Sequence, residues 1–172
     1  MRHRLLVALL AAASTAAAAE PIDACSLLSA ADLAELGVPA NAIGSLEQQQ
    51  HGGVAYCRYL VPGVPPADSP ATVIWSRAVP DRVRQARAMM SMAASQGSPA
   101  QLAARGEFIA DNATCKVVAA SRVETSQCLG TTEQSVVGLT LRRATQDPQP
   151  AYPALQLRFV AKLVAGVAAA GG

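Results

Sequence analysis

The sequence has few aromatic residues and, after its first few positions, a single histidine. Its 172 residues include one Trp, three Tyr and two Phe, so we expect a core built mainly from Ala, Val and Leu. No Cys-x-x-Cys pair occurs, and His51, in a predicted turn, has no second imidazole at ligand spacing. A cysteine nucleophile would also have only His51 as a base. We therefore expect no metal, no cofactor and no thiol chemistry.

Familiar catalytic motifs and an excess of charge are also lacking. The sequence contains no Gly-x-Ser-x-Gly elbow, phosphate-binding loop or histidine-based zinc motif, which argues against the common hydrolases and nucleotide enzymes. The formal net charge is +2, but Arg2 and Arg4 lie in an N-terminal segment that we expect to be removed. Without them, 12 of the 14 basic residues remain against 12 acidic ones. We therefore expect no nucleic-acid partner.

The first 19 residues have the pattern of an export signal. A basic start, "MRHR", precedes the apolar run Leu5–Ala13 and a small-residue region that ends in an Ala-x-Ala pattern at Ala17–Ala19. The apolar run is shorter than the roughly 20 residues that span a bilayer, so we expect no transmembrane segment. We predict a single periplasmic or extracellular domain over residues 20–172.

Four cysteines follow the signal, in a chain predicted to enter a compartment where disulfides persist. Cys115 and Cys128 flank a stretch that predicts two strands turning near Ser121 and Arg122, which would place these cysteines opposite each other. We therefore predict a Cys115–Cys128 disulfide, which leaves Cys25 to pair with Cys57. Cys25 lies too far behind the apolar run, after Asp23, for a lipid anchor.

The remaining pattern predicts an α+β fold, with a mostly antiparallel sheet of about six strands in the order α-βββ-α-βββ-α. Ser29 is a good N-cap with Asp32 at the third helical position, and Gly37 can close that helix. In the second helix, Val83, Ala86 and Met90 share one face, and we expect the methionines to fill the core. The two similar halves fit either a duplication or chance. We predict helices near 29–37, 81–95 and 154–169, strands near 42–49, 53–61, 71–78, 116–120, 124–129 and 135–142, and a connection over 97–106.

A resemblance covers about residues 22–60. The stretch "DACSLLSAADLAELG", followed later by "CRY", resembles the opening of a family of exported bacterial lipoproteins and secreted proteins of unknown function, related to the extracellular sensor domains of mycobacterial receptor kinases. The resemblance implies a disulfide-stapled sheet with flanking helices and a ligand cleft. This chain differs in lacking a lipid-attachment cysteine, and "RGEFIADN" does not reproduce the Gly-rich segment expected near the middle of the domain. The residues that carry the resemblance are Cys25, Leu27, Leu28, Gly37, Cys57 and Tyr59.

These observations favour a non-enzymatic binding or sensor-like module for a small ligand, a wall fragment or a protein. Two alternatives stay open. One is an enzyme of unfamiliar type whose carboxylates, such as Glu107 and Asp111, converge in a cleft. The other is an inhibitor of a secreted protein.

One candidate binding surface follows from strand periodicity. Tyr56 and Arg58 share one face of their strand, and Trp75 and Arg77 share a face of the next. If the strands pair about a centre near Pro66, Arg58 lies opposite Trp75 and Tyr56 opposite Arg77, which would present rings and guanidinium groups together. The alternative is that Trp75 is simply buried in the core.

We predict that the exported protein begins near Glu20, because signal peptidase cleaves after a small-residue pattern such as Ala17–Ala19. Intact-mass measurement of the exported chain checks the position. A lipid-modified N-terminus at Cys25 would contradict this prediction.

Overall fold

The computed structural model describes residues 22–48, 53–77, 80–110, 112–120, 123–144 and 152–170. The predicted signal segment 1–19, His51, Asp111 and the predicted turn at Ser121 and Arg122 lie outside these residues. The elements are α1 (Ala30–Glu35), β1 (Ile43–Gln48), β2 (Val54–Leu60), the 3-10 helix η1 (Pro66–Asp68), β3 (Ala71–Arg77), α2 (Pro80–Ser95), α3 (Pro99–Ala104), β4 (Glu107–Ala110), β5 (Ala113–Ala120), β6 (Val123–Thr131), β7 (Ser135–Ala144) and α4 (Tyr152–Ala169).

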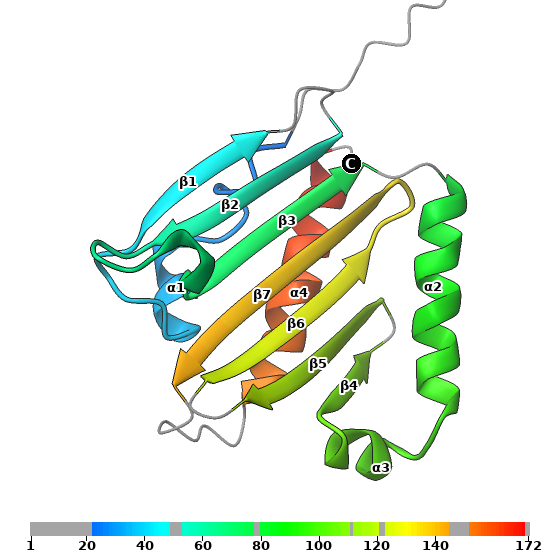
Figure 1. Cartoon of the computed structure of the whole chain (residues 1–172). Coiled ribbons are helices and arrows are strands. Elements are labelled where there is room, and N and C mark those ends of the chain that lie inside the picture. The colour runs from blue at the N-terminus through cyan, green and yellow to red at the C-terminus, as the bar shows by residue number, and fades with distance from the viewer. Residues whose placement is uncertain are drawn as a thin grey trace, which may run out of the picture.

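The described strands form one seven-stranded sheet in the order β1-β2-β3-β7-β6-β5-β4, and all neighbouring strands are antiparallel. The predicted α+β class is confirmed, with seven strands in place of about six. In Figure 1, α4 crosses behind the sheet, whereas α2 stands beside β6. Among the described residues, no helix has the length and apolar character needed to cross a membrane.

The additional strand, β4, is only four residues long and pairs with β5 at one edge of the sheet. The helix before it, α3, lies in the stretch interpreted as a connection. Its capping box was the overlooked signal: the Ser98 side chain accepts from the Gln101 backbone, and the Gln101 side chain accepts from the Ser98 backbone. Pro99 occupies the first helical turn, where its missing N–H has no effect.

Alternate residues of each strand project to opposite faces, and only one face is covered by α1 and α4. We call this the helix-covered face and the other the open face. The hydrophobic strand residues buried on the helix-covered face are Ala55, Cys57, Tyr59, Ala71, Val73, Trp75, Ala113, Cys115, Cys128, Val137, Leu139 and Leu141, which form one core with Phe159, Val160, Leu163 and Val167 of α4.

Both predicted disulfides are present. Cys25 bonds to Cys57 and ties the segment before α1 to β2, with the Cα atoms 5.0 Å apart. Cys115 and Cys128 are direct partners in the β5–β6 register, as the hairpin argument required, and their Cα atoms are 4.0 Å apart. On the chain-entropy account, each disulfide restricts the unfolded chain and thereby raises the free energy of unfolding by roughly 3 to 4 kcal/mol.

α4 lies close against the sheet at Gly130 of β6. A Cβ atom at Gly130 would lie 2.4 Å from Cγ2 of Val164 and 2.9 Å from Cγ1 of Val160. Valine side chains in a helix hold essentially one rotamer and cannot turn away. The glycine at this position therefore sets the distance between α4 and the sheet.

We predict that Gly130→Ala destabilises the fold by about 1 to 3 kcal/mol, because the added methyl group overpacks the contact with Val160 and Val164. Urea denaturation measures the change.

Gly138→Ala is the matched control, since Gly138 lies in the neighbouring strand β7 and opens to the other face. Its Cβ would meet Leu129 and Ile74 at ordinary contact distances of 3.5 and 3.6 Å. We expect a change within about 0.5 kcal/mol. Equal losses in both variants would contradict a specific contact with α4.

Candidate functional site

Two rows of side chains cross the open face of the sheet. Within a row, each residue is the direct cross-strand partner of the next. The rows are two residues apart along each strand, or about 7 Å. The first, which we call the apolar row because most members are apolar, is Tyr56, Ile74, Gly138, Leu129, Thr114 and Ile109. The second, the polar row, is Arg58, Thr72, Thr140, Gln127, Lys116 and Glu107.

The helix α2 stands over part of the apolar row. Val83 is buried, and the Arg87 guanidinium donates to the Thr132 carbonyl at 2.9 Å and to Thr131 Oγ1 at 3.3 Å. These contacts hold the first half of α2 at the end of β6. Ala86 and Met90, one turn apart on the same side, then face the sheet, as the helical periodicity predicts.

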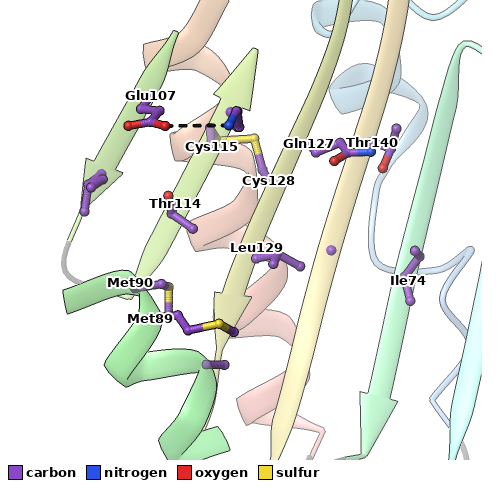
Figure 2. Close-up of a pocket in the computed structure, with 14 residues that line it drawn as sticks. Ile74, Met89, Met90, Glu107, Thr114, Cys115, Gln127, Cys128, Leu129 and Thr140 are labelled. Carbon is purple, nitrogen blue, oxygen red and sulfur yellow. Dashed lines mark ion pairs between the residues drawn. A yellow bond between two sulfur atoms is a disulfide. The ribbon is translucent and has the colours of Figure 1, made fainter. Parts of the chain in front are cut away.

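A groove of about 490 Å³ lies between α2 and the sheet. Figure 2 shows Met89 and Met90 projecting from α2 toward β5 and β6, on the side from which Leu129 projects. Leu129, on the interior strand β6, is 47% exposed, and Met89 of α2 is 54% exposed, although both line the groove. The prediction that the methionines fill the core is therefore wrong for Met89, and also for the exposed Met92.

A second hollow of about 410 Å³ continues from the first toward β2. The two share Ile74 and Thr140, so they adjoin each other on the open face, and we call the two hollows together the depression. The rim of the second hollow is the loop that contains η1. Arg142 holds this loop by donating from Nη1 to the Ala67 carbonyl and to Asp68 Oδ1, the latter at 2.8 Å.

The structure separates the four residues of the predicted binding surface. Tyr56 and Arg58 line the second hollow, whereas Trp75 is buried on the helix-covered face and donates from Nε1 to Ser135 Oγ at 3.2 Å. The predicted partners are wrong, since Arg58 pairs with Thr72 and Tyr56 with Ile74. Arg77 is exposed at the end of β3, opposite Ser135. The alternative of a buried Trp75 is confirmed.

Of the two carboxylates named for the enzyme alternative, the structure describes Glu107 alone. Glu107 lies at the β4 end of the groove, 3.7 Å from Lys116 Nζ and 3.3 Å from Arg105 Nη2. Two cations thus share this carboxylate. In the described part of the chain, no group of three or more His, Cys, Asp or Glu side chains could hold a metal ion.

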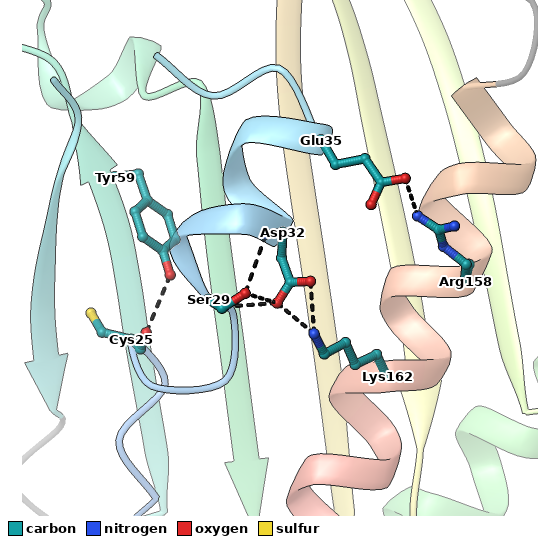
Figure 3. A network of polar contacts seen from close by, with 7 residues as sticks. All are labelled: Cys25, Ser29, Asp32, Glu35, Tyr59, Arg158 and Lys162. Atoms are coloured by element: carbon teal, nitrogen blue, oxygen red, sulfur yellow. Dashed lines mark hydrogen bonds and ion pairs between the residues drawn. The ribbon is translucent and has the colours of Figure 1, made fainter. Parts of the chain in front are cut away.

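A separate polar network joins α1 to α4 on the helix-covered side (Figure 3). The Asp32 carboxylate accepts from Lys162 Nζ at 2.6 Å, and it completes the capping box of α1 by accepting from the Ser29 backbone at 2.8 Å. Glu35 forms an ion pair with Arg158. Because every contact here joins one helix to the other or caps α1, this network supports the fold.

Burial also affects the one tyrosine of this region. Desolvation raises the pKa of Tyr59, and the nearby Asp23 and Asp32 carboxylates act in the same direction. Its hydroxyl lies 3.4 Å from the Cys25 carbonyl, beside the disulfide to Cys57. Tyr59 therefore stays neutral and fixes the segment before α1.

Sequence reasoning missed the residues that make the groove, chiefly Leu129, Gly138 and Met89. One signal was available: if Cys115 and Cys128 are paired toward the core, their neighbours Thr114 and Leu129 must project to the other face. The contribution of Gly138 depended on the pairing of β7 with β3, which no local signal gives.

No protein-family model matches this chain, and no curated protein matches it. A search of solved structures finds, among its matches, a crystal structure of a protein from Bacteroides thetaiotaomicron VPI-5482, at 10% sequence identity and a TM-score of 0.36. The match covers 71% of this chain and 41% of the other, so the chain spans less than half the length of that protein.

The Asp32 network predicts a loss of stability in acid. Hydrogen bonds from Lys162 and Ser29 lower the pKa of Asp32 from 3.8 to about 2. Since the pKa is lower in the folded state, the ionised carboxylate stabilises the fold above pH 3.8, and this contribution is lost as the pH falls toward 2. We expect Lys162→Met to lower stability near pH 6 by about 1 kcal/mol, limited by solvent screening, and to flatten the pH dependence in denaturation experiments.

Arg158→Met is the control, because it removes the other ion pair between the same two helices. The side chains of Arg158 and Glu35 are 60% and 50% exposed, so their pair contributes little. An acid transition that Lys162→Met leaves unchanged, or that Arg158→Met removes equally, would count against the Asp32 contact.

Proposed function

We propose that this protein is an exported, non-enzymatic binding module that holds an apolar ligand in the groove between α2 and the open face of the sheet. The observation that carries the proposal is Leu129, a large apolar side chain left 47% exposed in the middle of a sheet, under a helix that presents Met89 and Met90 to the same space. Exposed apolar surface of this kind marks interaction sites in soluble proteins.

The dimensions of the groove support a small ligand. Its volume of about 490 Å³ falls within the range of about 300 to 1,000 Å³ that is typical of small-molecule sites. Gly138 contributes to this volume, because a Cβ there would extend toward Leu129 and Ile74. The lining is mostly apolar, with Thr114, Gln127 and Thr140 as neutral polar groups that can orient a ligand.

The methionines suit a site that adapts to its ligand. Methionine is unbranched and polarisable, and it recurs at surfaces that accept varied apolar partners. Because α2 is fixed through Val83 and Arg87 in its first half, Met89 and Met90 form a wall that adjusts by side-chain rotation.

Export is supported by the cysteines and by the N-terminal segment. All four cysteines of the sequence form disulfides, a state that persists outside the cytoplasm. The signal-like segment 1–19 and the resemblance over residues 22–60 support the same location, in the periplasm or outside the cell.

The test uses the neutral fluorescent probe N-phenyl-1-naphthylamine, whose emission rises in apolar sites. We expect saturable binding to the protein without its signal segment, and about a tenfold weaker affinity for Leu129→Thr, which removes apolar contact and keeps a residue that favours strands.

Val118→Thr is the matched control. Val118, on β5, projects to the open face as Leu129 does from β6, is 52% exposed and lies outside the groove. We expect this variant to bind the probe as the parent protein does. Absence of probe binding, or equal weakening by both variants, would overturn the proposed site.

A further inference from the structure

The two ends of the depression on the open face differ in their charged side chains. Three of the four charged side chains that line it are cationic, namely Arg58, Arg142 and Lys116, and the fourth is Glu107. Lys116 and Glu107 form an ion pair at the β4 end, whereas both arginines line the second hollow, at the end formed by β2, β3, β7 and the η1 loop.

At the β4 end, the charge of the lining is already balanced. Glu107 lies 3.7 Å from Lys116 and 3.3 Å from Arg105, so its carboxylate occupies the position where an incoming anion would meet these cations. An anionic group placed there would be repelled by Glu107.

At the arginine end each cation also has an acidic partner, Glu47 for Arg58 and Asp68 for Arg142, but neither of these carboxylates lines the hollow. Arg58 makes a 3.6 Å ion pair with Glu47, whose side chain is 54% exposed, and such a pair is weak and readily exchanged. Arg142 is held more firmly through Nη1 by Ala67 and Asp68. A guanidinium carries five N–H donors, so the bonds of Nη1 position the group and leave donor capacity for a ligand.

The distance between the arginines and the apolar groove sets the length of a ligand that reaches both. Arg58 is on β2 and Leu129 is on β6, three inter-strand spacings or about 14 Å away across the strands. The two residues also lie in different rows, about 7 Å apart along the strands, so their separation is about 16 Å. Ile74 and Thr140 line both hollows, so the two hollows adjoin each other at these residues.

We propose that the ligand is a single-chain amphipathic carboxylate of the fatty-acid class, with its carboxylate at Arg58 and Arg142 and its hydrocarbon chain along the apolar row beneath Met89 and Met90. This inference rests on the proposed function, because the chain occupies the groove assigned there. Guanidinium groups match a carboxylate in charge and planar geometry, and Thr72 and Thr140 supply neutral hydroxyl groups beside them.

The test measures displacement of N-phenyl-1-naphthylamine at pH 8 by dodecanoate and by dodecylammonium, which have the same chain length and opposite charge. Both are used below the concentrations at which they form micelles. We expect dodecanoate to displace the probe at a concentration about tenfold lower, and this preference to shrink as salt is added.

Arg58→Gln is the principal variant, because Arg142 also holds the η1 loop. We expect it to weaken dodecanoate binding about fivefold to tenfold with an unchanged affinity for the neutral probe. Arg142→Gln should do the same, provided that its melting temperature matches that of the parent protein. Lys116 lines the groove itself, so Lys116→Gln is compared with the parent protein by its preference between the two amphiphiles: we expect the ratio of the dodecanoate and dodecylammonium concentrations to stay unchanged.

The outcomes separate this inference from the proposed function. If the neutral probe binds and both amphiphiles displace it equally, the anionic ligand is excluded and the apolar groove stands. If dodecanoate binding depends on Lys116 and is indifferent to Arg58, the position of the carboxylate is wrong. If the neutral probe fails to bind, the proposed function fails first.

Discussion

Burial of one face of the sheet beneath α4 is the constraint on which the other features depend. Cys57, Val73, Leu139 and Cys128 stand in one line on that face, each the cross-strand partner of the next. Their neighbours along each strand must then project to the other side. The register that buries the core residues thus also decides which residues project to the open face, and α2 covers only part of that face. Leu129 is exposed because nothing in the described chain packs over it completely.

Features set by short-range chemistry were predictable. Ser29 and Asp32 form the expected capping box, and Gly37 takes the positive φ that the end of α1 requires. The Cys115–Cys128 pair followed from two strands and one turn, all within a short stretch of chain. Pairing of these cysteines then left a single partner for Cys25, so one local argument settled both disulfides.

Register and the groove required information from distant parts of the chain. The predicted partner of Arg58 was Trp75, and the observed one is Thr72, three residues away. Any odd shift moves the partner to the opposite face, so this small error joined a core residue to a surface residue. The η1 turn within the loop between β2 and β3 was not anticipated. Predicting the groove would have required still more long-range information, because the groove combines α2, the β5–β6 pair and the pairing of β3 with β7.

The central β3–β7 pair joins two halves of the sheet, and the groove lies across this junction. Trp75 and Ser135, which touch across this pair, are 60 residues apart in sequence, so the pair closes a long loop and carries a high entropic cost. β1–β3 and β4–β7 are each made of sequential antiparallel neighbours. The floor of the groove takes Ile74 from the first unit and Gly138 and Leu129 from the second. A molecule bound in the groove would contact both units at once, so its binding would stabilise the junction between them.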